Sequence, residues 1–145
     1  DFYMPAEVSS ENKKRMEWLI NNDEYDLPNH LRPDCHKEGT TYKAVYGRLY
    51  PDAPAGTITG GFMSPGRGRF THPFEPRALT AFEASILQGF PSNYKFYDQD
   101  TYPGNSHLAR IIGDAVSPYM SKLIGIGIGI DLLIKDEELN ENKAA

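Results

Sequence analysis

Two arginines separated by a single glycine have the clearest binding chemistry in this chain. Residues 66–69 read Gly-Arg-Gly-Arg, so Arg67 and Arg69 carry two guanidinium groups on a flexible backbone. Glycine lets the main chain approach a ligand closely, and a guanidinium group donates hydrogen bonds in a fork that matches phosphate oxygens. The loop is therefore predicted to bind a polyanion, and these residues alone do not name it.

The thiol and imidazole groups form weaker patterns. Cys35 stands between Asp34 and His36, and an acidic neighbour disfavours the thiolate that a nucleophile requires. Zinc sites typically have a close pair of ligands at each end, whereas here an adjacent Cys-His pair is joined only by the distant His30. We therefore assign no catalytic residue and no metal ligand, and interpret Cys35 as an ordinary loop residue.

Length and composition restrict the class of protein. The chain has 145 residues, of which 39% are hydrophobic and 12% aromatic, so it can bury the core of one domain and is not wholly disordered. A single cysteine excludes an internal disulfide. The most apolar run, residues 123–130, is far shorter than the ~20 residues that cross a bilayer, so we expect no membrane partner and a cytoplasmic location. Since Asp1 is not an initiator methionine, we expect a piece of a longer protein.

Charge is unevenly distributed along the chain. The net charge is −5, yet residues 32–77 carry seven basic side chains against four acidic ones. Residues 1–31 carry the reverse, three basic against seven acidic. Because local charge governs contact with phosphate groups, the acidic total does not argue against a nucleic-acid partner.

A capped helix is predicted directly after the Arg loop. Residues 80–83, Thr-Ala-Phe-Glu, fit the capping box, in which the Thr80 hydroxyl accepts from the Glu83 N–H and the Glu83 carboxylate accepts from the Thr80 N–H. We predict a helix over residues 81–88, with Gly89 as its stop and Pro91 preventing continuation. Its apolar side, Phe82, Ile86 and Leu87, is expected to press on the core.

Upstream of the Arg loop, the pattern predicts one helix and two short strands. Ser9 or Ser10 can cap a helix over residues 11–20, and residues 23–41, with their prolines and polar side chains, indicate an irregular connection. Residues 42–50, Tyr-Lys-Ala-Val-Tyr-Gly-Arg-Leu-Tyr, are β-prone and predict a strand. Residues 56–59 predict a shorter one.

Downstream of the capped helix, two further helices are predicted. Ser106 can cap a short helix over residues 107–112, and Ser117 followed by Pro118 is a second start signal. Residues 125–130, Gly-Ile-Gly-Ile-Gly-Ile, have the period of a strand, and each glycine inside a helix costs ~1 kcal/mol relative to alanine. Because the flanking residues have helical spacing, we predict a helix over 118–134. The charged residues 135–145 predict a frayed tail.

Two blocks of this sequence, found in the expected order, resemble a known family. Residues 76–91, Pro-Arg-Ala-Leu-Thr-Ala-Phe-Glu-Ala-Ser-Ile-Leu-Gln-Gly-Phe-Pro, resemble the ninth motif of DNA (cytosine-5) methyltransferases, roughly Arg-x-Leu-Thr-x-Arg-Glu-x-x-Arg-Leu-Gln-Gly-Phe-Pro. Residues 112–118, Ile-Gly-Asp-Ala-Val-Ser-Pro, resemble the tenth motif, Ile-Gly-Asn-Ala-Val-Pro-Pro. Thr57-Ile58 resembles the Thr-(Leu/Ile/Val) pair of the family's target-recognition domain. The resemblance covers residues 42–134 and matches the family's C-terminal end.

Four positions depart from the motifs. Phe82 and Ile86 stand where the ninth motif commonly has arginine, which alters packing or ion pairs more than chemistry. In the tenth motif, Asp114 replaces asparagine and Ser117 replaces the first proline. This loop lines the S-adenosylmethionine pocket in the family, and a carboxylate can still accept hydrogen bonds from the cofactor's amino group. Cofactor affinity is the property that Asp114 is expected to affect.

The resemblance implies an α+β fold in which a small target-recognition domain of short strands and loops is braced by the capped helix. C-terminal helices would then pack on the Rossmann-like α/β catalytic domain of the whole enzyme. It also implies a division of the chain into an N-terminal helix and connection (1–41), a target-recognition region with the ninth motif (42–105), the tenth motif and last helix (106–134), and a tail (135–145).

The resemblance further implies a function and a set of site residues. The whole enzyme flips a cytosine out of the duplex and transfers a methyl group from S-adenosylmethionine to its C5 atom, in DNA methylation or restriction-modification. The expected cofactor contacts are Gly113, Asp114, Ala115 and Val116. The expected contacts with double-stranded DNA are Arg67, Arg69, Arg48, Thr57, Thr59 and Ser64. Structural roles are expected for Arg77, Thr80, Glu83, Gln88 and Pro91.

The catalytic motifs of that family are absent from this sequence. It holds no Pro-Cys-Gln, no Glu-Asn-Val and no Phe-x-Gly-x-Gly, so we expect the isolated chain to be inactive. Three interpretations stay open: a fragment of a single-chain methyltransferase, a subunit of a split methyltransferase that needs a catalytic partner, or a DNA-binding module without a methylation role. In the first two, the apolar side of the last helix, Met120, Leu123, Ile124 and Ile128, is left uncovered and favours self-association.

Overall fold

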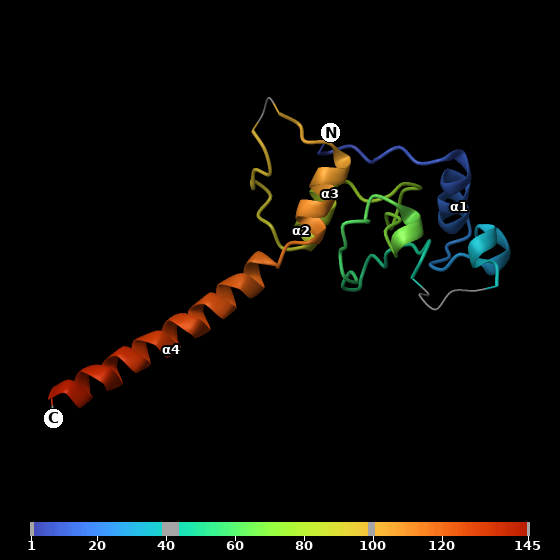
Figure 1. The fold of residues 1–145 in the computed structure, drawn as a ribbon. Coiled ribbons are helices and arrows are strands. Elements are labelled where there is room, and N and C mark those ends of the chain that lie inside the picture. The colour runs from blue at the N-terminus through green and yellow to red at the C-terminus, as the bar shows by residue number, and fades with distance from the viewer. Residues whose placement is uncertain (1, 39–43, 99–100, 145) are drawn as a thin grey trace. The chain divides into compact units, whose positions relative to one another are not determined.

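The computed structural model describes residues 2–38, 44–98 and 101–144, and its regular elements are helices joined by long irregular segments (Figure 1). The α-helices in these ranges are α1 (Ser10–Asn21), α2 (Ala81–Leu87), α3 (Asn105–Gly113) and α4 (Pro118–Ala144). Short 3₁₀ turns lie at Asn29–Leu31, Asp34–His36 and Pro65–Arg67. The chain divides into two compact units, Asp1–Ala115 and Val116–Ala145, which are described separately below.

The helix predicted over residues 11–20 is confirmed as α1. Ser9 is its N-cap, and the Ser9 hydroxyl accepts a hydrogen bond from the Asn12 N–H at 3.3 Å. This bond satisfies one of the donors that a helix leaves unpaired at its first turn. Met16 and Leu19, three residues apart, are buried, so α1 turns one side to the interior of its unit.

The capped helix is also confirmed, and α2 ends where Gly89 was predicted to stop it. Gly89 has a φ of 87°, a conformation that favours glycine, and its N–H donates to the Ile86 carbonyl group. The side predicted to face the core is different, however. Ala81, Ala84 and Ser85 are the buried residues, and the two alanines share the core with residues of α3, whereas Ile86 and Leu87 are exposed.

The helix predicted over residues 107–112 is present as α3, but the prediction that Ser106 caps it is wrong. Gly104 is the N-cap, with a φ of 86° that favours glycine, and its carbonyl group accepts from the Leu108 N–H at 3.1 Å. The helix therefore begins earlier than expected and includes Ser106 in its first turn. Leu108, Ala109 and Ile112 are buried.

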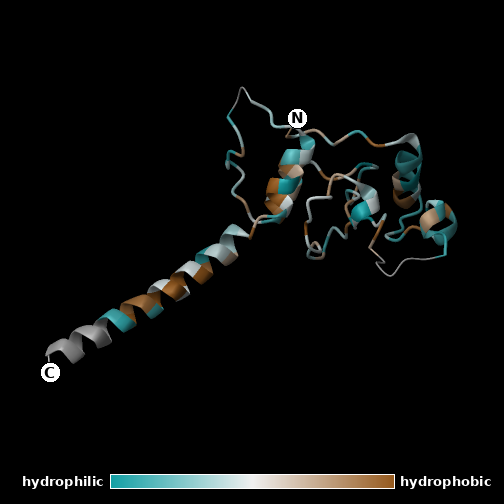
Figure 2. Cartoon of the chain, in the orientation of Figure 1, coloured by the Kyte–Doolittle hydropathy of each residue, from teal (hydrophilic) through white to brown (hydrophobic). Residues whose placement is uncertain are grey.

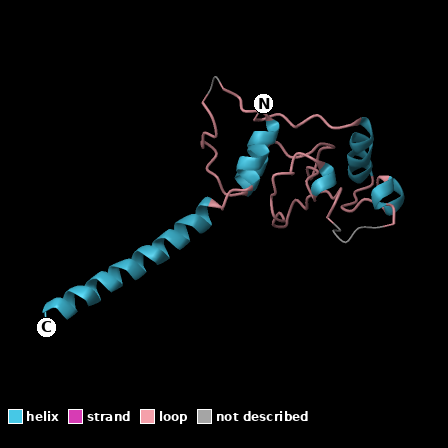
Figure 3. Ribbon diagram, in the orientation of Figure 1, coloured by secondary structure: helices cyan, strands magenta, loops and turns pink. Residues whose placement is uncertain are grey.

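The strands predicted over residues 42–50 and 56–59 are not formed in the described part of the chain (Figure 3). Residues 42 and 43 lie outside it. Residues 44–46 form a turn in which Tyr46 has a φ of 59°, which breaks an extended conformation. Only isolated bridges occur, between Arg48 and Thr71 and between Thr71 and Ala78. The expected strand half of an α+β recognition domain is therefore replaced by irregular segments that pair at single residues.

The core of the first unit joins the N-terminal residues, the irregular segments and the helices α2 and α3. Its largest members include Phe62, Phe70, Leu79, Leu108 and Ile112. The chain start contributes too, since the Phe2 carbonyl group accepts from the Phe82 N–H at 3.0 Å and the Phe2 ring packs edge-on against Phe82. These contacts hold α2, α3 and the segment between residues 58 and 70 in one body.

The second unit consists of α4 and the residues just before it, and α4 confirms helix rather than strand for residues 125–130. The helix runs on to Ala144, so the frayed tail predicted for residues 135–145 is wrong for the part described. Figure 2 shows hydrophobic residues along α4, and its large apolar side chains are exposed, from Met120 to Ile134.

By length and composition alone, the stretch Asn105–Asp136 would suffice to cross a membrane. Core helices of soluble proteins reach the same length and apolar composition. Two separate helices make up this stretch, and the first of them, α3, buries Leu108 and Ile112 in the core.

Candidate nucleic-acid interface

The N-terminus of α2 is fixed by a hydrogen-bonded group of charges. The capping box is present: the Thr80 hydroxyl accepts from the Glu83 N–H at 3.1 Å, and Glu83 Oε2 accepts from the Thr80 N–H at 2.9 Å. Arg77 donates to both carboxylate oxygens of Glu83, at 2.8 and 2.7 Å. Burial pushes the pKa of Glu83 upward, but the bonds from Arg77 and Thr80 outweigh it and hold the pKa at about 2.

The same charged residues shift the pKa values of Arg77 and His72. Hydrogen bonds to Glu83 and then Glu75 raise the pKa of Arg77, so its charge is permanent. Burial lowers the pKa of His72, Arg77 lowers it further, and the two glutamates offset this only in part. His72 is therefore neutral at pH 7, although its Nε2 lies 3.6 Å from Glu83 Oε1.

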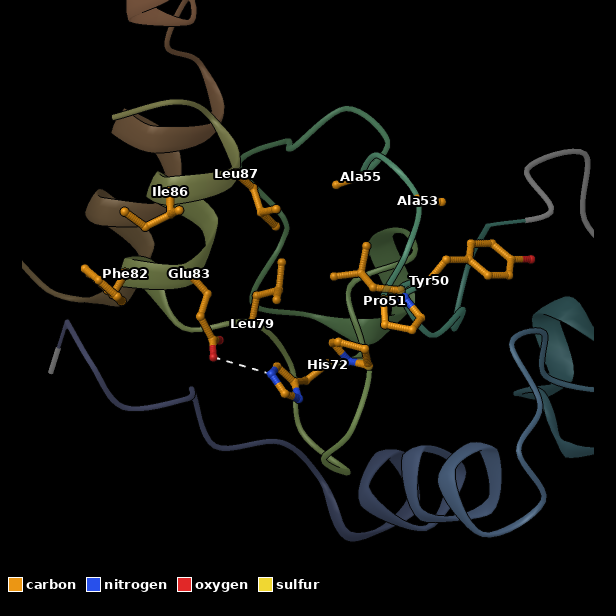
Figure 4. A pocket seen from close by; sticks show the side chains of 12 residues that line it. Tyr50, Pro51, Ala53, Ala55, His72, Leu79, Phe82, Glu83, Ile86 and Leu87 are labelled. Atoms are coloured by element: carbon orange, nitrogen blue, oxygen red, sulfur yellow. Dashed lines mark ion pairs between the residues drawn. The ribbon is translucent and has the colours of Figure 1, made fainter. Parts of the chain in front are cut away.

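An apolar hollow of about 330 Å³ lies between α2 and the segment around Pro51. Figure 4 shows the side chains of Glu83 and His72 pointing toward each other at its edge. The exposed Ile86 and Leu87 of α2 line it together with Leu79 and Phe82. Its lining is mostly hydrocarbon, so it differs from a site for a charged ligand.

Gln88 connects the end of α2 to the loop that follows α3. Its side-chain Nε2 donates to the Ile112 carbonyl group at 2.9 Å and to the Ala115 carbonyl group at 3.4 Å. The first bond satisfies an acceptor that a helix leaves unpaired at its C-terminus, and the second holds the residue after the C-cap of α3. Pro91 follows Gly89 outside the helix, and the ring of the intervening Phe90 packs against Phe96. The segments that resemble the ninth and tenth motifs are thus joined directly.

The backbone of residues 59 and 60 lies directly against Gly113. A Cβ atom on Gly113 would come within 2.1 Å of the Gly60 nitrogen and 2.3 Å of the Thr59 carbonyl carbon. Such separations are far inside van der Waals contact, so this position requires glycine. The close approach puts the end of α3 beside the segment that follows Thr57-Ile58.

Arg48 and Arg69 are occupied by bonds within the chain. Arg48 donates to Asp23 at 3.0 Å and to the Pro73 carbonyl group at 2.7 Å, and only 7% of its side chain is exposed. Arg69 donates to Asp26 at 2.5 Å and to the carbonyl groups of Tyr25 and Arg48. These bonds leave little of either guanidinium group for a ligand.

Two tyrosine rings complete this group. Tyr25 and Tyr50 stack at 4.5 Å, Arg48 lies over the Tyr25 ring and Arg69 lies over the Tyr50 ring. A guanidinium group is attracted to the face of an aromatic ring. The group ties the acidic segment after α1 to the Arg loop, which gives both arginines a positioning role in the described structure.

Arg67 differs from its neighbour. Its side chain is exposed and makes no hydrogen bond or ion pair with any described residue. Gly61 accommodates its stem, since a Cβ atom on Gly61 would meet the Arg67 Cδ atom at 2.4 Å. Arg67 borders a second hollow of about 700 Å³, which we call the arginine hollow. Its lining consists of Val45, Thr59, Gly60, Gly61, Gly66, Arg67, Ser106, Arg110 and Asp114.

The other expected DNA contacts are dispersed. Thr59 is exposed in the arginine hollow, and its hydroxyl accepts from the Gly61 N–H at 3.4 Å. Thr57 is exposed on a separate small cavity that also touches Arg69. Ser64 is partly buried before the 3₁₀ turn, where its carbonyl group accepts from the Arg67 N–H. The structure thus brings Thr59 and Arg67 together and leaves Thr57 and Ser64 outside that hollow.

The expected cofactor residues span the boundary between the two units. Gly113, Asp114 and Ala115 end the first unit, and Val116 begins the second. Asp114 is exposed, and its carboxylate makes no hydrogen bond or ion pair in the described part of the chain. A free carboxylate of this kind can accept hydrogen bonds from an amino group.

No site for a metal ion is found among the described residues. His30, Cys35 and His36 do not form a group with the geometry of a ligand set, and Cys35 is exposed. The residue that sequence reasoning missed is Arg110, which lines the arginine hollow from α3. Its place one helical turn before Asp114, on the same side of a helix, was the available signal.

The chain matches the family model described as C-5 cytosine-specific DNA methylase over residues 4–129. It is 43% identical over 126 residues to the type II methyltransferase M1.BsuMI of Bacillus subtilis (strain 168), a match that covers 86% of this chain and 29% of that protein. It is 38% identical over 105 residues to the type II methylase M.HgiDII of Herpetosiphon aurantiacus, covering 71% of this chain and 29% of that relative. The chain therefore spans less than a third of the length of these relatives.

A third relative is much shorter. The type II methyltransferase M.AquIB of Picosynechococcus sp. is 31% identical over 99 residues, which cover 64% of this chain and 68% of that relative. No solved structure matches the chain.

Proposed function

This chain belongs to the C-5 cytosine-specific DNA methylase family, and we propose that it is the C-terminal, DNA-reading portion of such an enzyme. In its whole form the enzyme transfers a methyl group to C5 of a cytosine flipped out of double-stranded DNA. The carrying observation is that the segment after Thr57-Ile58, the helix α2 and the loop after α3 form one packed body. Gln88 and the contact between Gly60 and Gly113 join them.

Arg67 is the DNA contact that we assign to the Arg loop. It is exposed, and its stem lies along Gly61, so the guanidinium group is presented at the surface without an internal partner in the described structure. Arg48 and Arg69 hold that loop in place through Asp23 and Asp26. Thr57, Thr59 and Ser64 remain proposed contacts, which set the register on the DNA backbone.

We assign the wall of the cofactor site to Gly113, Asp114, Ala115 and Val116. S-adenosylmethionine supplies the methyl group when it is bound. The free carboxylate of Asp114 accepts hydrogen bonds from an amino group, and Gly113 keeps this loop close to the recognition segment. The catalytic cysteine belongs to a portion of the enzyme outside this chain. The chain alone therefore binds DNA and completes the cofactor site, but does not methylate cytosine.

The biological setting that we propose follows from the relatives. Several are named type II methyltransferases, which supports a cytoplasmic restriction-modification enzyme that acts on double-stranded DNA. Within the chain, we keep residues 42–105 as the recognition region and residues 106–134 as the part that completes the cofactor site.

A second candidate function is favoured by the short relative. Since 99 aligned residues make up 68% of M.AquIB, a protein about as short as this chain carries the name of a type II methyltransferase. This supports a subunit that becomes active only with a separate catalytic chain. An in-frame Pro-Cys-Gln in the coding sequence upstream indicates a fragment, and a neighbouring gene that carries it indicates a subunit. If neither is present, a DNA-binding module without methylation is favoured.

The test is to assay the chain alone and with the portion that carries the Pro-Cys-Gln loop. We expect tritium transfer from labelled S-adenosylmethionine to duplex DNA only when both are present. We also expect the chain alone to bind a labelled duplex with an affinity that falls steeply with salt, because Arg67 neutralises phosphate charge. Arg67→Ala should weaken binding without lowering the melting temperature, whereas Arg69→Ala should lower the melting temperature. No transfer with both portions present, or no DNA binding by the chain, would overturn the proposal.

A further inference from the structure

The seven arginines of the chain fall into two groups. Five donate side-chain hydrogen bonds to carbonyl, amide or carboxylate oxygens within the chain: Arg15, Arg32, Arg48, Arg69 and Arg77. The side chains of the other two, Arg67 and Arg110, make no hydrogen bond or ion pair with any described residue. Both line the arginine hollow, although 43 positions separate them in the sequence.

The backbone around the hollow holds these two arginines in place. The Arg67 stem lies against Gly61, where a side chain would collide with it. Arg110 belongs to α3. A Cβ atom added at Gly60 would lie 3.5 Å from the Arg110 Cα atom, in ordinary van der Waals contact. The chain at residues 60 and 61 therefore lies beside both the Arg67 stem and the backbone of Arg110. The two positive charges are thus brought to one hollow by the fold.

Hydroxyl groups accompany the guanidinium groups. Thr59 and Ser106 are exposed in the same hollow. The Thr59 oxygen accepts from the Gly61 N–H, which leaves its own O–H free to donate. Arginine, threonine and serine side chains, together with main-chain N–H groups, are the donors that most often contact DNA phosphates.

One carboxylate, that of Asp114, also borders the hollow. It reduces the local charge from +2 to +1 and cannot contact a phosphate directly. A phosphate in the hollow is therefore expected to contact the arginine and hydroxyl groups and not Asp114. Asp114 stays available for the cofactor role assigned above.

We propose that the arginine hollow binds one phosphate group of the DNA backbone, with Arg110 and Ser106 of α3 as contacts in addition to Arg67 and Thr59. The inference rests on the proposed function, and it goes further by giving the helix before the tenth motif a direct part in holding DNA. Arg110 acts with Arg67 on the same phosphate, so the two contributions depend on each other.

The experiment measures binding of a fluorescein-labelled 20-base-pair duplex to the whole chain, by anisotropy at 50 and 200 mM KCl. The variants are Arg67→Ala, Arg110→Ala, the double variant, Arg110→Lys, and Lys95→Ala as a control. Lys95 is an exposed cation that does not line the hollow. A thermal melt of each variant confirms that it is folded.

We expect Arg110→Ala to raise Kd about tenfold, as loss of a hydrogen bond to a charged group does. The double variant should reduce the ratio of affinities at the two salt concentrations by about threefold, since losing the contact with one phosphate lowers the salt slope by about 0.9. Arg110→Lys should keep that ratio because it keeps the charge. The double variant should lose less than the product of the two single losses, because both arginines serve one phosphate.

The outcomes separate the two proposals. If Arg67→Ala weakens binding while Arg110→Ala behaves like Lys95→Ala, the phosphate site on α3 is overturned and the proposed function stands. Fully multiplicative losses would also overturn the shared site, because they indicate two independent contacts. If the wild-type chain binds no duplex at either salt concentration, both proposals fail.

Discussion

Glu83 carries two structural tasks with one carboxylate. Its Oε2 atom accepts from the Thr80 N–H, which caps α2, and both of its oxygens accept from Arg77. The side chain is 28% exposed, so these bonds form in a partly desolvated place. The charge on Glu83 therefore stabilises the folded chain more than an exposed ion pair would.

The pKa of Glu83 makes this a pH-dependent contribution. Because the pKa of Glu83 is about 2 in the folded chain and 4.5 for an unperturbed glutamate, as in the unfolded chain, Glu83 stabilises the fold fully above pH 4.5. The contribution is lost as the pH falls toward 2. We expect Glu83→Gln to lower the free energy of unfolding by roughly 2 kcal/mol at pH 7 and to have almost no effect at pH 2. Urea denaturation at a series of pH values measures it.

Glu75→Gln is the matched control, since Glu75 shares the partner Arg77 but is 57% exposed. Its effect at pH 7 should be clearly smaller. Glutamine at position 83 can still accept from the Thr80 N–H, so the cap itself is kept. An equal loss from Glu83→Gln at pH 7 and pH 2 would show that the charge is not the cause.

At the scale of elements, three segments depend on one glycine. Gly113 ends α3, and the backbone of Thr59 and Gly60 lies against it where a side chain would be. Gln88 of the capped helix donates to the carbonyl groups on either side of Gly113. The segment around Thr59, the helix α2 and the end of α3 are therefore held together as one body.

Gly113→Ala tests this packing because two effects of opposite sign compete. Alanine is favoured over glycine inside a helix by ~1 kcal/mol, which alone would stabilise α3. The Cβ atom, however, would meet the Gly60 nitrogen at 2.1 Å, and overpacking costs about 1–3 kcal/mol or more. We expect net destabilisation, measured as a lower melting temperature.

Gly56→Ala is the control for this prediction, because an added Cβ at Gly56 meets nothing within 4 Å. Its melting temperature should equal or slightly exceed that of the wild type, since alanine restricts the unfolded chain more than glycine does. A rise in melting temperature for Gly113→Ala as well would contradict the close contact.

At the scale of the whole molecule, the largest exposed apolar surface that concerns function is on α4. Leu123 is 49% exposed and Ile128 is 56% exposed, and similar values hold for most large side chains from Met120 to Ile134. Exposed apolar surface of this extent marks a site of association. The portion of the enzyme outside this chain is the partner that we propose for it.

In the absence of that portion, we expect the chain to associate with itself through α4. Sedimentation equilibrium should give a mass above the 16.3 kDa of the monomer, increasing with concentration. The double variant Leu123→Gln/Ile128→Gln should shift the equilibrium toward the monomer, and Ser121→Gln, on the same helix, should not. A wild-type chain that stays monomeric at high concentration would contradict this prediction.

The helix caps could be predicted from the sequence because the two residues that form each hydrogen bond lie within a few positions of each other. Ser9 and Asn12, and Thr80 and Glu83, are each three positions apart, so the caps of α1 and α2 could be predicted together with the helices. The two motif blocks and their family were recognisable for the same reason, since each is a continuous stretch. Residues 125–130 were ambiguous alone and were decided by their helical neighbours.

The strands were mispredicted because β-propensity describes a residue's fit to a neighbouring strand that the sequence does not supply. Residues 42–50 have suitable side chains, but Tyr46 and Gly47 turn the chain, and only Arg48 pairs with Thr71. The buried side of α2 was mispredicted for a similar reason. Which side faces inward depends on α3, and α3 packs on the small residues Ala81 and Ala84.

The sequence by itself determined that two arginines flank Gly68, that a capped helix follows them, and that the chain belongs with cytosine methyltransferases. Only the tertiary structure decided which arginines are free. Asp23 lies 25 positions from Arg48, and Asp26 lies 43 positions from Arg69, so no local pattern reveals these pairs. Arg110 joins Arg67 because the backbone of Thr59 and Gly60 packs against Gly113 of α3, while the Arg67 stem lies against Gly61. The sequence gives the charge of each arginine, but whether its guanidinium group is free to bind a ligand depends on where the fold places the acidic and carbonyl groups around it.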